Sequence, residues 1–316
     1  MFISEECTMT TETLTEYYKH SHDEAIMSNY RPIIRATMQG LSAFTDISFS
    51  HKFWDQLAQI TPCKPMAINY VHKDIIMSKE FLNDSLKTLE FIGANTKDKY
   101  QSAKFTISMG IVTYIIKLYS EILNHELRNT VSGRILFRTM VEAYINLKYL
   151  LYKEPHTPDV FEKFQSYGLG KYKLVMAKLR EGKYQEDPDA HINFRMLELY
   201  VNEVKDEEFT PINLGYFDKD KIKKKFELVG EMELYEIYYD YDTNYAHAFW
   251  GAIRESSMLL CDNPSHLYHC VPDYTMEQML LDIDHDCIMI LKKVFSAISS
   301  YIDLPDFYVD KYGIRC

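Results

Sequence analysis

The stretch RILFRTMVEAYINLKYLLYKE, residues 134–154, decides the fold class. Its apolar residues recur at three- and four-residue intervals, which is the period of an α-helix, and they cover most of the helix surface. A helix that is apolar nearly all round is normally buried. Arg134, Arg138 and Glu142 nevertheless recur every four residues on one stripe. Because a buried arginine requires a partner, this stripe is the first candidate for a functional site.

The same helical period returns through most of the chain, and proline-containing segments interrupt it. Helix starts are signalled by capping boxes at Thr13–Glu16 and Thr275–Gln278, and by Thr157-Pro158. The pattern predicts an all-α fold, a multi-helix bundle of about ten helices. We expect these helices near 12–22, 51–60, 66–94, 99–127, 130–153, 158–181, 189–206, 218–230, 233–261 and 275–302.

The predicted domain organisation is a single bundle with an N-terminal extension. The chain has 316 residues, of which 47% are hydrophobic, so it can bury a sizeable core. No connecting segment is polar enough to divide the bundle. We therefore expect a helical extension over residues 1–60 and one bundle domain over residues 61–316.

Composition excludes several classes of protein. The formal net charge of −11 argues against diffuse attraction to nucleic acids or anionic membranes. The longest uncharged run, residues 105–116, is shorter than the roughly 20 residues that span a bilayer. The N-terminus is acidic and lacks the pattern of a secretory signal, and the six cysteines have no paired spacing. We expect a cytoplasmic protein with no membrane association and no cofactor.

A second polar stripe lies in residues 238–260. At helical spacing Asn244, His247, Gly251 and Arg254 share one face, and a glycine in such a stripe permits another backbone or a ligand to approach closely. Histidine transfers protons near neutral pH, and arginine stabilises developing anionic charge. We predict that the two stripes face each other across a helix–helix contact and form a polar cleft.

The catalytic hypothesis assigns a role to each side chain in this cleft. His247 acts as general acid and base, Arg138 stabilises a phosphate, and Glu142 orients Arg138. The expected substrate contacts are Asn244, Arg134 and Arg254. The alternative interpretation is structural: Arg138 and Glu142 form an ordinary surface pair, and His247 is a core histidine satisfied by a neighbour.

Residues in both stripes carry a family resemblance. Arg138-Thr139-x-x-Glu142, followed about a hundred residues later by Asn244-x-x-His247, resembles an uncharacterised bacterial all-helical family of unknown function over residues 100–262. More distantly, polar Asn/His helices in a bundle are similar to the HEPN superfamily. That superfamily includes metal-independent ribonucleases of toxin and anti-phage systems, which carry an Arg and a His four to six residues apart on one helix. In this chain no arginine stands at that distance before any of the histidines.

Other groups of polar residues favour simpler interpretations. Cys261, His266, His269 and Cys270 lack the paired spacing of a zinc site, so we expect no bound metal. The acidic run at 282–286 and the lysines between 219 and 225 are expected to be solvated helix surfaces. Phosphate-binding loops, G-x-S-x-G and HExxH motifs are absent from the sequence.

Two classes of function follow. The resemblance implies a defence- or toxin-type helical protein that cleaves RNA without metal through the Arg/Glu/His/Asn cleft. The alternative is a non-catalytic helical module for protein–protein interaction, whose polar stripe fixes helix register. The expected partners are accordingly RNA or another protein, with a homodimer as a further option.

Overall fold

The computed structural model describes residues 63, 75–96, 102–181, 191–203, 217–261, 270–275, 277–278 and 280–314. The predicted extension over residues 1–60, with its helices at 12–22 and 51–60, lies outside this part of the chain, so the predicted domain boundary stays a prediction. The chain divides into two compact units, which are described separately. The larger contains His72–His247 and Leu280–Cys316, and the smaller contains Met1–Val71 and Ala248–Met279.

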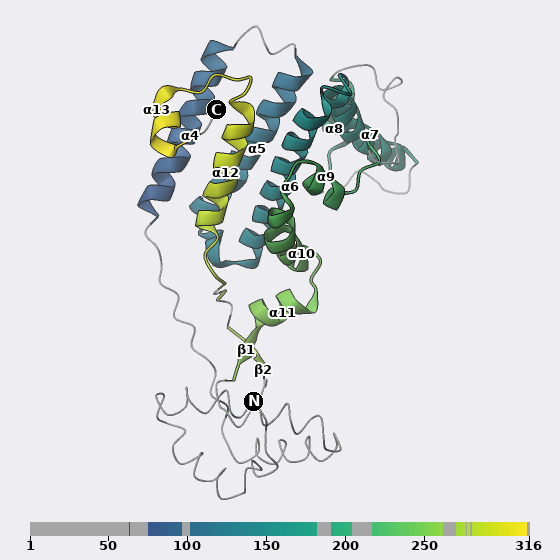
Figure 1. Ribbon diagram of the computed structural model, residues 1–316. Helices are drawn as coiled ribbons and strands as arrows, with labels where there is room; N and C mark the ends of the chain where they lie inside the picture. The colour runs from purple at the N-terminus through teal and green to yellow at the C-terminus, as the bar shows by residue number, and fades with distance from the viewer. Residues whose placement is uncertain are drawn as a thin grey trace, which may run out of the picture. The chain divides into compact units, whose positions relative to one another are not determined.

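The larger unit is a bundle of helices in which α4, α5, α6 and α12 run alongside one another (Figure 1). The α6 helix is central, because it packs against α5, α12, α9 and α10. The elements of this unit are α4 (Ile76–Asn95), α5 (Ala103–Asn124), η2 (Leu127–Asn129), α6 (Val131–Lys153), α7 (Val160–Arg180), α8 (Phe194–Val201), α9 (Ile222–Leu228), η4 (Leu234–Tyr239), α10 (Asp240–Ala246), α12 (Asp284–Ile298) and α13 (Asp306–Tyr312).

The quoted stretch forms α6, and most of its surface is buried as predicted. Phe137, Met140, Val141 and Ile145 are fully buried in the core. The neighbouring helix α5 is long and apolar enough to cross a membrane by length and composition alone, and 44% of its apolar window is buried inside the fold. Helical bundles bury such stretches in their cores. The all-α prediction is confirmed.

Local chemistry fixes where α6 begins. Thr130 is its N-cap, and the threonine hydroxyl accepts a hydrogen bond from the backbone N–H of Gly133 at 3.1 Å. Gly133 has no room for a side chain, because a Cβ there would lie 2.0 Å from the Leu127 carbonyl oxygen. The preceding η2 turn can therefore pack directly against the first turn of α6.

The α12 helix begins later than the capping box at residue 275 predicted. It starts at Asp284, and the segment before it is held by the η2 turn. The backbone N–H groups of Leu280 and Ile283 donate to the carbonyls of Asn129 and Arg128, at 2.9 and 3.3 Å. Because these amides are used in tertiary hydrogen bonds, the helix forms only after them.

The predicted single helix over 233–261 is wrong. It is divided into η4, which is a π-helix, then α10, and then α11 (Trp250–Ser257), with Ala248 in the left-handed region at φ 50° between the last two. A residue with positive φ lies outside the right-handed helical region, so a continuous α-helix cannot contain it. In the smaller unit α11 leads into strand β1 (Met258–Leu260), which pairs antiparallel with β2 (Cys270–Pro272).

Candidate functional site

Arg138 directs its guanidinium at partners inside the larger unit. Its Nε donates to Thr243 Oγ1 at 3.1 Å, its Nη1 to Glu142 Oε2 at 3.3 Å and its Nη2 to the Tyr239 hydroxyl at 2.7 Å. The Tyr239 hydroxyl donates in turn to Glu142 Oε2 at 3.2 Å, and the guanidinium carbon lies 4.5 Å from the centre of the Tyr239 ring. The Arg138 side chain is 18% exposed. Its charge is therefore matched within the fold.

Arg134, one turn earlier on α6, is more deeply buried than Arg138. Its Nη2 donates to the carbonyl oxygen of Leu281 at 2.9 Å. The guanidinium carbon also lies 5.8 and 6.0 Å from the ring centres of Tyr241 and Tyr245 on α10. Carbonyl and aromatic partners lower the cost of burying the cation. This predicted substrate-binding residue consequently serves as a packing contact between α6, α10 and the segment before α12.

The stripe continues along α6 to its C-terminal end. The Tyr149 hydroxyl donates to Asp220 Oδ2 at 2.6 Å, and Lys153 forms an ion pair with the same oxygen at 2.9 Å. The Tyr149 hydrogen bond, followed by that of Lys153, lowers the pKa of Asp220. We call Arg134, Arg138, Glu142, Tyr149 and Lys153 the polar seam of α6. Through this seam α6 holds residues 217–246 on its surface.

Lys225 contradicts the prediction that the lysines at 219–225 are a solvated surface. Its side chain is 2% exposed and lies over the Phe217 and Tyr149 rings, with the ammonium 4.4 and 4.8 Å from the ring centres. Asp218 is 3.5 Å away. Burial lowers the pKa of Lys225, and the negative charges of Asp218, Asp220 and Glu142 oppose this effect. One lysine of the cluster has therefore become part of the core beside the polar seam.

The predicted partners of Arg138 lie elsewhere on α10. The Asn244 amide nitrogen donates to the carbonyls of Asp240 and Tyr241 in its own helix, at 3.1 and 3.0 Å. His247 is exposed at the C-cap of α10. Within the described part of the chain, neither residue forms a hydrogen bond with Arg138 or Glu142. Thus α6 and α10 do pack together, but the polar contacts between them differ from those predicted.

The remaining predicted substrate contact, Arg254, lies in a different part of the molecule. It is half-buried in α11, which belongs to the smaller unit, whereas Arg138 and His247 belong to the larger one. The break after α10 and the left-handed Ala248 remove Arg254 from the helix on which the predicted stripe depended. Spacing on a continuous helix therefore no longer relates Arg254 to Asn244 and His247.

Tyr239 and Thr243 are partners of the polar seam that the sequence did not predict. Polar periodicity selected Asn244 and His247, but the inward-facing side of η4 and α10 carries Tyr239, Asp242 and Tyr245, all of which are buried. Tyrosine can bury its ring and still offer a hydroxyl to a buried arginine, which a short amide cannot do at that reach. The signal available in the sequence was the four-residue spacing from Tyr239 to Thr243.

A second polar cluster ties three elements together at Glu231, which precedes η4. Its Oε1 accepts hydrogen bonds from the Tyr144 hydroxyl and from Lys148, both at 2.6 Å, and its Oε2 accepts one from Lys293 of α12 at 2.9 Å. Burial alone raises the pKa of Glu231, but the hydrogen bonds from Lys148, Tyr144 and Lys293 outweigh it, so the net pKa is lowered. The carboxylate is therefore held ionised at neutral pH.

Two carboxylates of the acidic run before and within α12 also have partners in the fold and are not simply solvated. Asp282 forms an ion pair with Arg128 at 2.7 Å. Asp284 accepts hydrogen bonds from the Tyr119 hydroxyl at 2.8 Å and from Ser78 at 2.5 Å. These contacts connect the start of α12 to α4, α5 and the η2 turn. The apolar stripe of α12 is buried as expected, but these carboxylates have partners.

The residues considered for zinc are only partly described. Cys261 and Cys270 are half-buried in the smaller unit, and His266 and His269 lie outside the described residues. Within the described ranges, no group of three or more histidine, cysteine, aspartate or glutamate side chains could hold a metal ion. The expectation that the protein binds no metal therefore stays a prediction.

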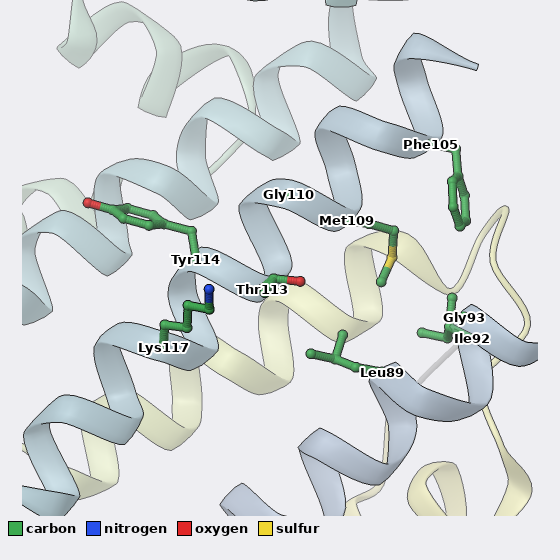
Figure 2. A pocket seen from close by; sticks show the side chains of 9 residues that line it. All are labelled: Leu89, Ile92, Gly93, Phe105, Met109, Gly110, Thr113, Tyr114 and Lys117. Carbon is green, nitrogen blue, oxygen red and sulfur yellow. The ribbon is translucent and has the colours of Figure 1, made fainter. Parts of the chain in front are cut away.

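The larger unit has an apolar hollow between α4 and α5 (Figure 2). Its volume is about 540 Å³, within the range of ligand-binding clefts. Leu89, Met109 and Thr113 point into the space between the two helices, and Tyr114 points away from these side chains (Figure 2). We call this hollow the α4–α5 groove, which is lined among others by Leu89, Ile92, Phe105, Met109, Gly110 and Lys117.

Comparison with known proteins gives one family. A family of unknown function, DUF5677, matches residues 105–266, which include most of α5 and all of α6, α10 and α11. This range agrees with the resemblance inferred over residues 100–262. No curated protein and no solved structure matches the chain. The matched region covers slightly more than half of the 316 residues, and the chain belongs to this family of unknown function.

Proposed function

We propose that this protein is a non-catalytic helical interaction module in which the polar seam of α6 is structural. The observation that carries this proposal is the use of Arg138. Its Nε, Nη1 and Nη2 each donate a hydrogen bond to a side chain of the fold, namely Thr243, Glu142 and Tyr239. A phosphate would have to displace these partners, and it would leave Glu142 without its arginine.

The alternative, a metal-independent ribonuclease of a defence or toxin system, receives less support from the geometry. General acid–base catalysis requires the proton donor and the anion stabiliser to reach the same reacting group. His247 is exposed at the end of α10, whereas the Arg138 guanidinium is directed at Tyr239 and Thr243. The formal net charge of −11 also disfavours binding of a polyanion such as RNA.

An RNA-cleavage assay in the presence of EDTA tests the proposal. We expect the full-length protein to release no more fragments from single-stranded RNA than buffer does. The His247→Ala variant should be indistinguishable from wild type in this assay and in its circular dichroism. The proposal is overturned if wild type cleaves RNA and the folded His247→Ala variant does not.

A further inference from the structure

The α4–α5 groove is a concave surface of the larger unit, and none of its lining residues belongs to the polar seam. Leu89 and Ile92 form one wall, and Phe105 and Met109 form the other. Its apolar lining extends onto exposed surface, because Leu86 lies one turn before Leu89 and is 44% exposed. Isolated exposed apolar residues are ordinary, but an apolar hollow that continues onto exposed apolar surface favours a binding site.

Gly110 opens the middle of this groove. A glycine in a helix interior is about 1 kcal/mol less favourable than alanine and normally allows a close approach by another group. A Cβ added at Gly110 would meet no other atom of the described residues within 4 Å, so no described part of the protein makes that approach. The groove therefore has room for another group at Gly110, where α5 has no side chain.

The dimensions of the groove favour a helix as its occupant. The lining of α5 runs from Phe105 to Lys117, which corresponds to about 18 Å at 1.5 Å per residue. Packed helices lie about 8–10 Å apart, and a helix with its side chains is about 10–12 Å wide. A docked helix of about three turns would cover both walls together with Leu86, whereas one extended acyl chain would cover only the floor. Helix-in-groove recognition uses apolar anchors at i, i+4 and i+7.

Charge gives the groove a direction. Its end near Phe105 and Ile92 is apolar, whereas Lys117 lies at the opposite end of the α5 lining. Lys117 is exposed and forms no ion pair with any residue in the described ranges. A ligand with an acidic group at that end would supply the missing counter-charge.

We propose that the α4–α5 groove binds an amphipathic helix of a partner protein, about three turns long, with an acidic residue over Lys117. The inference rests on the proposed function as an interaction module and names the class of partner. Apolar side chains on successive turns of the partner occupy the space between Leu89 and Met109, and the partner backbone or a small side chain passes over Gly110.

Selection from a displayed library of helix-forming peptides tests this inference with the full-length protein. Peptides that bind wild type should share apolar residues at i, i+4 and i+7 and an acidic residue near one end. In fluorescence anisotropy, Gly110→Phe should weaken the selected peptides at least tenfold. The matched control is Gly168→Phe on α7, because Gly168 also has no atom within 4 Å of an added Cβ, and its affinity should equal that of wild type.

A charge reversal at Lys117 gives an independent readout that does not fill the groove. Lys117→Glu should weaken peptides with an acidic end and strengthen versions of the same peptides in which lysine replaces that residue. If circular dichroism shows that Gly110→Phe does not fold, the Lys117→Glu measurement decides the result. The inference is overturned if no peptides are enriched, or if they bind Gly110→Phe and Lys117→Glu as tightly as wild type.

Two other occupants are distinguished by the same variants. A wild-type dimer that Gly110→Phe converts to a monomer would assign the groove to a second copy of this chain and overturn the partner-helix inference. Saturable binding of dodecanoate, with no peptide binding, would assign it to an acyl ligand and overturn it as well. Neither result affects the proposal that the polar seam is non-catalytic, which depends on RNA cleavage and His247.

Discussion

Replacing Glu231 by glutamine should destabilise the protein by removing the charge that joins α6, α12 and the segment before η4. The Glu231 side chain is 10% exposed, whereas Lys148 and Lys293 are 34% and 37% exposed. Exposed ion pairs contribute about 0.2–1 kcal/mol, and breaking a fully buried pair costs about 3–5 kcal/mol. Because both lysines can regain water, we expect an intermediate loss of about 2 kcal/mol in the free energy of unfolding.

The same variant should change how stability depends on pH. The pKa of Glu231 is lowered in the folded protein from its ordinary value of 4.5. The unfolded state therefore binds the proton more readily, and the contribution of Glu231 is fully present above about pH 4.5 and is lost as the pH falls through the folded pKa. Wild type should lose more stability than Glu231→Gln over this acid range, so their two curves should converge.

Urea unfolding followed by circular dichroism measures both effects, provided that the m-value is unchanged. The control is Glu198→Gln, because Glu198 is 49% exposed and its oxygen lies 3.9 Å from Arg180. We expect the control to change stability by less than about 0.5 kcal/mol. If Glu231→Gln is as silent as Glu198→Gln, or if its difference from wild type is the same at pH 7 and pH 4, the assigned role of Glu231 is refuted.

Further substitutions probe the α6 surroundings. Gly133→Ala should lower the free energy of unfolding by about 2–3 kcal/mol, because the new Cβ would lie 2.0 Å from the Leu127 carbonyl oxygen. Gly110→Ala should raise it by up to about 1 kcal/mol, because the new Cβ would meet no atom of the described residues within 4 Å. Thermal denaturation of both variants checks these values. Lys225→Met should leave stability at pH 7 unchanged or raise it by about 1 kcal/mol, because burial lowers the pKa of Lys225. As the pH rises from the folded pKa of Lys225 towards 10.5, the stability of wild type should increase relative to that of Lys225→Met, because the unfolded chain binds the extra proton in this range. Urea midpoints of both proteins at pH 7 and pH 10 measure this difference.

The helical class and the burial of α6 could be predicted because both depend on local periodicity. The apolar period of residues 134–154 requires burial on most sides whatever the neighbours are. The break at Ala248 could not be predicted, because alanine carries no turn signal. The β1–β2 ladder could not be predicted either, because its strands are only three residues long. The α13 helix was missed although Pro305 and Gly313 bracket it, with Gly313 in the left-handed region.

The candidate site was predictable in part. The four-residue spacing of Arg134, Arg138 and Glu142 identified the stripe on α6 and its need for partners on another helix. The spacing could not identify those partners. We had assumed that the most polar residues of the second helix, Asn244 and His247, would face the arginines. Tyr239 lies at the end of a π-helix, and such a segment changes which residues face inward relative to a regular α-helix.

Double-mutant cycles in urea unfolding test whether the polar seam of α6 is structural, because they compare the observed partner of Arg138 with the predicted one. One cycle combines Arg138→Ala with Tyr239→Phe, and the other combines Arg138→Ala with His247→Ala. The structural role of the seam predicts a coupling of about 1 kcal/mol or more in the first cycle and a value within about 0.3 kcal/mol of zero in the second. A coupling of about 1 kcal/mol between Arg138 and His247, with none between Arg138 and Tyr239, would contradict it.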